Sequence, residues 1–268
     1  MLNAVAVVAA ALVQTRFEAI DPELLEHVLG RLTQLPRTEF IRIARRERGI
    51  LHENLPPAVA AAVADQLNAL NIGVASVPAS SLPELSKPRI ALWIEPDDTG
   101  FGVPLDHRQV LERIDWHSVF AIHADLLPDP HAKADKATAA TQQRAAAQPG
   151  STTKLSRRFP NVDLVCISAA GKFVHFRIAQ SRFAPGRMPW IPVEQPLADK
   201  FYQLLQLLID RSTAAIISPA ARRLSVERPV STHTLAEQWL EDKDERAMTS
   251  YLRWLVWLAM HREQQLAK

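Results

Sequence analysis

The two residues whose types come nearest to a catalytic pair are Cys166 and His175, which stand in two neighbouring strand-like segments. If Ala170 and Gly171 are the central residues of a tight turn between these strands, Cys166 lies directly opposite His175, where a thiolate and an imidazolium could pair. However, alanine fits poorly at the positive φ of such a turn, a longer loop would shift the register, and the pattern places no orienting acid. We therefore favour a small buried cysteine over a catalytic dyad.

Histidines and carboxylates also gather in one short stretch, and such residues are common ligands of metal ions. They are His117, His123, Asp125, Asp129, His131 and Asp135. The first two share one face of a predicted strand but lie about 20 Å apart at ~3.3 Å per residue, which is too far to bind one ion. The later members fall in a polar, low-complexity stretch. The chain also lacks a glycine-rich phosphate loop and a nucleophile elbow, so we predict no metal site and no cofactor.

Two arginine-rich stretches are candidate anion-binding sites. Their residues are Arg42, Arg45, Arg46 and Arg48 in a predicted helix, and Arg157 and Arg158 at the end of the polar stretch. Phosphates of nucleic acid or of an acidic membrane surface are the groups that such clusters bind. Glu39 lies three residues before the first arginine, so an intrahelical ion pair accounts for part of the charge. A solvent-exposed surface is therefore favoured, and anion binding is the alternative.

The C-terminal part of the chain concentrates aromatic area. Its rings include Trp239, Tyr251, Trp254 and Trp257. Two or three such rings bury enough surface to join this part to a domain or to build a dimer contact. Packing within the chain is the favoured interpretation, and an interaction surface for a protein partner or a second copy is the alternative.

The composition is that of a globular protein. The 268 residues suffice for roughly two domains, and 47% apolar with 22% charged residues lies near the average for folded domains. A formal charge of +2 is too small to imply nucleic-acid binding by itself. The single cysteine excludes an internal disulfide and fits a reducing compartment, so we expect a cytoplasmic location.

Two apolar segments raise the question of membranes. Leu2 to Val13 lacks a Lys or Arg before the apolar run and a clear cleavage boundary after it, so we expect a buried strand or first helix rather than a signal peptide. Tyr251 to Met260 is apolar nearly all round, but it is shorter than the ~20 residues that a membrane helix needs, and it contains Arg253. We predict no transmembrane segment.

Residues 1–87 are expected to form an α/β domain. Asp21 before Pro22 is typical of a helix start, and Gly49 is typical of a helix end. The periodicity predicts helices at 22–35, 36–48 and 57–70, strands at 50–52 and 72–77, and a further strand within 2–13. This arrangement resembles ferredoxin-like modules.

Residues 88–212 are expected to form a β domain with one packing helix. Strands at 90–94 and 101–103 should pair around a turn that contains Asp97 and Asp98, whose side chains stabilise turns. The next strand, 115–123, should turn Trp116, Phe120 and Ile122 toward the core. A polar insertion at 129–158 is expected to be disordered.

The clearest strand signal follows the insertion. Segments 162–168 and 172–179 should form a hairpin, and 196–209 should form the packing helix. The predicted apolar face of the hairpin consists of Val165, Ile167, Val174, Phe176 and Ile178. Hairpins followed by one helix resemble the pleckstrin-homology or GRAM-type barrel, and Trp116 with Val119 is similar to the W-x-x-[IV] strand of bacterial members.

Residues 213–268 are expected to form a helical extension, with helices at 214–224, 234–240 and 245–264. The predicted fold class is α+β. The whole chain also resembles uncharacterised bacterial proteins, which implies an architecture but no activity. The main hypothesis is a non-catalytic protein-interaction or scaffold protein. A binder of anionic ligands and a cysteine-dependent enzyme are the alternatives.

Overall fold

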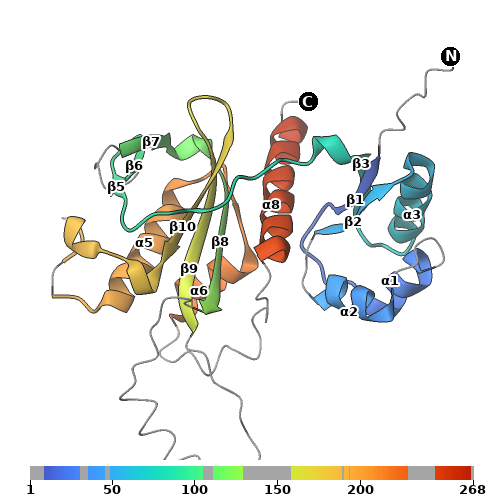
Figure 1. Cartoon of the computed structure of the whole chain (residues 1–268), viewed down its shortest axis with the longest axis horizontal. Coiled ribbons are helices and arrows are strands. Elements are labelled where there is room, and N and C mark those ends of the chain that lie inside the picture. Colours follow the sequence, from blue (N-terminus) through green and yellow to red (C-terminus); the bar gives the residue numbers. More distant parts are fainter. Residues whose placement is uncertain are drawn as a thin grey trace, which may run out of the picture.

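The computed structural model of the chain places two β-sheets on either side of one long helix, α8 (Glu245–Leu266), as Figure 1 shows. It describes residues 9–30, 36–45, 49–104, 111–128, 158–188, 190–192, 194–228 and 245–266. Helices and mixed sheets make up these parts, so the predicted α+β class is confirmed.

The first sheet has β1 at its centre. Its strands are β1 (Ala10–Gln14), β2 (Ile50–Leu55) and β3 (Val74–Pro78), in the order β2-β1-β3. Because β1 is antiparallel to both neighbours, β2 and β3 run parallel to each other, joined by a helix. All five residues of β1 are buried, because both faces of the strand are covered. Ala10 and Leu12 pack with helices on one face, and Ala11 and Val13 pack with α8 on the other.

Three helices cover the outer face of this sheet, away from α8 (Figure 1). They are α1 (Pro22–Leu29), α2 (Arg37–Arg45) and α3 (Pro57–Ala69). Asp21 caps α1 by accepting a hydrogen bond from the backbone N–H of Glu23 at 2.9 Å. Asn71 follows α3 at φ +63°, a conformation that asparagine tolerates. The strand expected within 2–13 is confirmed as β1, and α1 ends at Leu29, six residues before the predicted end at Leu35.

The second sheet has five strands in the order β11-β8-β9-β10-β4. Its strands are β4 (Arg89–Ile90), β8 (Val119–Pro128), β9 (Arg158–Ile167), β10 (Phe173–Ala179) and β11 (Ile216–Ile217). The three central strands are antiparallel, and the two short edge strands run parallel to their neighbours. The predicted hairpin of β9 and β10 is thus confirmed.

One face of the second sheet is covered by α5 (Leu197–Arg211), α6 (Pro219–Glu227) and a small sheet. That small sheet consists of β5 (Glu95–Pro96), β6 (Gly100–Pro104) and β7 (Leu111–Asp115). Ile122, Leu164 and Phe176 of the large sheet meet Phe201 and Leu205 of α5 in one apolar core. The predicted packing helix 196–209 is therefore confirmed as α5.

Two strand predictions are wrong in detail. Of the segment 90–94, only Ile90 belongs to a strand, β4, and β4 pairs with β10 instead of 101–103. Trp116 lies in a 3₁₀ turn, η2 (Trp116–Ser118), before β8 begins. A register irregularity between Val119 and Ala121 then places Val119 in the core with α5 and turns Phe120 toward α8. A period of two cannot anticipate such a bulge.

Helix α8 packs against both sheets. Trp254 donates its indole N–H to the Gln14 carbonyl at 2.7 Å, and its ring lies 4.9 Å from that of Phe17. On the other side Tyr251 packs against His123 of β8, with ring centroids 5.1 Å apart. Gly49 makes room for the tryptophan, because a Cβ there would lie 1.7 Å from a ring carbon of Trp254. Helix α8 is therefore part of both cores.

Candidate functional site

A row of polar side chains, three buried and one half-buried, crosses the face of the second sheet that is turned toward α8. We call His123, Asp163, His175 and Arg177 the polar row. Asp163 on β9 is the register partner of His123 on β8 and of Arg177 on β10. His175 precedes Arg177 by two residues on the same strand and therefore shares its face.

Hydrogen bonds join Asp163 to His175 and Arg177 within the polar row, and a separate one joins His123 to α6. Asp163 Oδ1 accepts from His175 Nε2 at 2.6 Å and from Arg177 Nε at 2.8 Å. His123 Nδ1 lies 3.0 Å from Oγ of Ser218, the N-cap of α6. Ser218 Oγ also accepts from the backbone N–H of Ala221, so its own proton is free to be donated to His123.

The environment sets the charges of the row. Burial tends to raise the pKa of Asp163, but the charge of Arg177 and the hydrogen bond from His175 outweigh it and hold that pKa well below its usual range. Burial lowers the pKa of His123 to about 4; Asp163 opposes this shift, and Arg177 and His175 add to it. Asp163 is therefore anionic and His123 neutral near neutral pH.

Three atoms of the row are buried without a hydrogen-bond partner among the described residues: His123 Nε2, Asp163 Oδ2 and His175 Nδ1. The three side chains are enclosed, at 2% exposure or less, so a substrate cannot reach them in this conformation. Within the described parts of the chain, no group of three His, Cys, Asp or Glu residues is arranged to hold a metal ion. The side-chain hydrogen bonds of the row therefore join β9 to β10 and β8 to α6.

Sequence reasoning did not assemble the polar row, although a signal was present. Polar residues recur at alternate positions of otherwise apolar strands, at His123 and Asp125, at Asn161 and Asp163, and at His175 and Arg177. Such a pattern indicates a shared polar stripe on one sheet face. The strand pairing is needed to see that the three stripes meet.

The predicted register of Cys166 and His175 is wrong. Cys166 pairs with Val174, and His175 pairs with Val165, because the connection from Ser168 to Lys172 is longer than a two-residue turn. Cys166 consequently lies in the apolar core with α5, whereas His175 lies on the opposite face. Burial raises the pKa of the thiol far above its usual value. This geometry does not make a cysteine–histidine dyad.

The same shift changes the predicted apolar face of the hairpin. Val174, Phe176 and Ile178 lie in the core with α5, as expected. Val165 lies on the other face, in the cluster around α8, so its predicted place is wrong. One extra residue in the connection moves the side chains of one strand to the opposite face.

The aromatic side chains of α8 are not an exposed interaction surface. Tyr251, Trp254 and Trp257 are at most 5% exposed, and they are buried against the two sheets of the same chain. That prediction is therefore wrong for these three residues, and packing within the chain is confirmed. Trp239 lies outside the described residues.

The predicted arginine sites stay predictions. Arg46, Arg48 and Arg157 lie outside the described residues, and the structure describes Arg42, Arg45 and Arg158 only as parts of α2 and β9. The predicted insertion at 129–158 and the predicted helix at 234–240 also fall outside the described residues, apart from Arg158.

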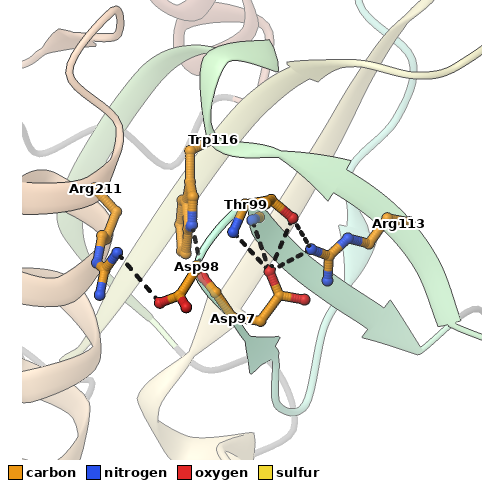
Figure 2. A network of polar contacts seen from close by, with 7 residues as sticks. Asp97, Asp98, Thr99, Arg113, Trp116 and Arg211 are labelled. Carbon is orange, nitrogen blue, oxygen red and sulfur yellow. Dashed lines mark hydrogen bonds and ion pairs between the residues drawn. The ribbon is translucent and has the colours of Figure 1, made fainter.

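Of the acid pair, Asp97 stabilises a turn, as expected, whereas the carboxylate of Asp98 lies 3.9 Å from the guanidinium of Arg211 on α5 (Figure 2). Figure 2 shows the Asp97 carboxylate accepting hydrogen bonds from Thr99 and Arg113, while the Trp116 indole donates to the Asp97 carbonyl at 3.0 Å. The guanidinium of Arg113 and the backbone N–H of Thr99 hold the pKa of Asp97 well below its usual range. This network closes the hairpin of β5 and β6.

Comparisons of the chain with models of protein families, with curated proteins and with solved structures found no match. Among the described helices, none has both the length and the apolar character that crossing a bilayer requires. The function is therefore inferred from the geometry.

Proposed function

We propose that this protein is a non-catalytic scaffold, in which α8 holds two α+β modules in a fixed orientation for contact with a protein partner. The observation that carries the proposal is the position of α8, whose aromatic side chains fill the space between the two sheets. Arg253 adds a fixed link on the N-terminal side, because it donates to the Glu53 carboxylate at 2.9 Å and to the Pro83 carbonyl at 2.9 Å.

A second copy of the chain is the partner that we propose. Strand β4 ends the five-stranded sheet, no other described strand pairs with its outer edge, and a free sheet edge can accept another strand. Ile90 in this strand and Leu92 beside it are 42% and 43% exposed, which is high for large apolar side chains. Pairing of two such edges would be isologous, the commonest symmetry of homodimers.

The two resemblances belong to this proposal as predictions. In the first sheet β1 lies between β2 and β3, which α3 connects along the chain. This β-α-β arrangement supports a ferredoxin-like first module. The packing of α5 on three antiparallel strands supports a pleckstrin-homology-like second module. A bacterial origin and a cytoplasmic location are likewise predictions.

Light scattering over a wide range of protein concentration tests the proposal. We expect the average mass to rise toward that of a dimer, and Ile90→Glu with Leu92→Glu to abolish this rise. Val226→Glu is the matched control, because Val226 is 79% exposed on α6. A strict monomer at every concentration would overturn self-association, and small-angle scattering that requires freely moving modules would overturn the fixed orientation.

A further inference from the structure

Strand β4 presents the backbone of one residue at the outer edge of the second sheet. In the parallel pair of β4 and β10, Arg177 lies opposite Ile90, and Ala91 donates its backbone N–H to the Arg177 carbonyl at 2.9 Å. Because Arg177 bonds to the two neighbours of Ile90, Ile90 itself directs its N–H and its C=O to the other side. No other described strand lies on that side.

The comparable edge of the first sheet, at β3, is closed by the chain itself. The side-chain amide of Asn68 donates to the Val74 carbonyl at 2.8 Å and accepts from the Val74 N–H at 3.1 Å. At the other end of β3, Pro78 has no N–H, and its carbonyl accepts from the Ser81 hydroxyl at 2.7 Å. These contacts occupy groups that an added strand would need. The backbone of Ile90 has no such contact with the described residues.

Apolar side chains border the free edge at β4. Ile90 and Leu92 alternate along the chain with Arg89 and Ala91. Arg89 forms an ion pair with Glu112 of β7 at 2.6 Å, and Ala91 lies in the core with α5, so these two point to the opposite face. The ion pair also compensates the charge of Arg89, which a second copy would otherwise meet.

We propose that two copies of the chain pair β4 with β4 in antiparallel orientation, with Ile90 of one copy opposite Ile90 of the other. Each Ile90 donates its N–H to the carbonyl of the other, because a residue that directs both groups outward is complementary to itself across a two-fold axis. Leu92 of one copy then lies opposite Pro88 of the other, so apolar side chains meet along the joint. Two five-stranded sheets thereby form one continuous sheet. The inference rests on the proposed function, which names a second copy as the partner, and adds the register of the contact.

The neighbours of Ile90 restrict the register. Pro88 lacks an N–H donor, and the Leu92 carbonyl already accepts from the Ala184 N–H at 2.8 Å. A shift that places Ile90 opposite Pro88 or Leu92 therefore loses a hydrogen bond, whereas the pair centred on Ile90 keeps both. A contact of this size is typical of transient association, so the dimer should dissociate on dilution.

Disulfide cross-linking of the full chain tests the register. Opposed residues of such a pair have Cα atoms about 5.5 Å apart, within reach of a disulfide, so Ile90→Cys should form a covalent dimer on mild oxidation. Leu92→Cys should form one at least about tenfold more slowly, because the two copies of position 92 would lie about 14 Å apart at ~3.4 Å per residue. A mixture of Leu92→Cys and Pro88→Cys should cross-link rapidly again. The native Cys166 is buried and does not compete.

Val226→Cys is the matched control, because Val226 is 79% exposed but lies on α6 instead of the sheet edge. It should cross-link at the slow rate of Leu92→Cys. If Ile90→Cys is equally slow while light scattering shows a dimer, this register is wrong and self-association of the scaffold stands. If light scattering shows a monomer at every concentration, both proposals are wrong.

Amide hydrogen exchange of the wild-type protein tests the same contact without a substitution. The N–H of Ile90 should exchange at least about tenfold more slowly at concentrations at which the dimer predominates, since it is hydrogen-bonded only there. An unchanged rate in the dimer overturns the proposal.

Discussion

His123 is a buried imidazole at the meeting point of three elements. Strand β8 carries it, Ser218 at the start of α6 hydrogen-bonds to it, and Tyr251 of α8 packs on its ring. Its surroundings favour the neutral ring, because burial penalises charge and the guanidinium of Arg177 is close. Protonation of this single side chain would therefore disturb the contacts between β8 and both helices.

We expect acid to destabilise the protein through His123. The pKa of His123 is about 4 in the folded state and near 6.5 ordinarily, so between these values the unfolded chain binds more protons. Stability present above pH 6.5 is consequently lost as the pH falls toward 4, by on the order of 2 kcal/mol. Urea unfolding at pH 7.5 and 4.5 measures this loss.

Two variants make the pH test specific. His123→Gln should reduce the dependence of the unfolding free energy on pH, although its stability at pH 7.5 will be lower. His117→Gln should keep the dependence of the wild-type protein, since His117 is exposed. An unchanged pH dependence in His123→Gln would show that other groups cause it.

The thiol of Cys166 should react slowly with iodoacetamide near neutral pH. Cys166 is fully buried among apolar side chains, and burial raises the pKa of the thiol, so little thiolate is available to attack. Mass spectrometry should find modification only as fast as the protein opens, and prompt modification in urea. Rapid modification of the native protein would instead favour the cysteine-dependent enzyme.

At the scale of elements, the joint between α8 and the first sheet depends on a glycine. Gly49 has φ +67°, and the ring of Trp254 occupies the space where a side chain would stand. The tryptophan in turn donates to the carbonyl of Gln14 at the end of β1. Both the positive φ of Gly49 and the packing of Trp254 against it therefore require a residue without a side chain.

Gly49→Ala should lower the free energy of unfolding by about 2–4 kcal/mol, because it adds both backbone strain and a clash with Trp254. Gly171→Ala is a matched control: φ is +72°, but no atom lies within 4 Å of the added Cβ. That control should cost only about 1 kcal/mol, the strain alone. Chemical denaturation compares the two, and equal losses would contradict the packing described for Trp254.

Local signals predicted most elements and the pairing of β9 with β10, but not the register of that pair. Apolar spacing predicted α3, α5 and α8, and the Asp21–Pro22 start predicted α1, because these signals depend on neighbours in the sequence. The register of β9 and β10 depends on one residue in the connection from Ser168 to Lys172, which alternation does not report. The polar row joins strands far apart in the chain, so it was not predicted.

At the scale of the whole molecule, α8 makes one body of two modules. Met248, Leu252 and Leu255 belong to a single apolar cluster with residues of both sheets. Buried apolar contact of this kind resists relative motion more than a polar interface does. The two modules should therefore unfold together.

Removal of α8 tests this coupling. A variant that ends before Glu245 would expose the inner faces of both sheets, so we expect aggregation or loss of the cooperative thermal transition. Arg253→Ala is the milder companion change, because it keeps the helix and removes only the link to Glu53 and Pro83. If the shortened variant kept both the association state and the melting temperature of the full chain, α8 would not be part of either core.

The order of the elements along the chain has a consequence for synthesis. The ribosome synthesises α8 after every strand of both sheets. Until α8 is made, Val13 on one sheet and Val165 on the other lack the helix that buries them. During that interval the nascent polypeptide carries two open apolar faces that chaperones can bind. The time between the synthesis of β11 and that of α8 should then influence how much of the protein matures.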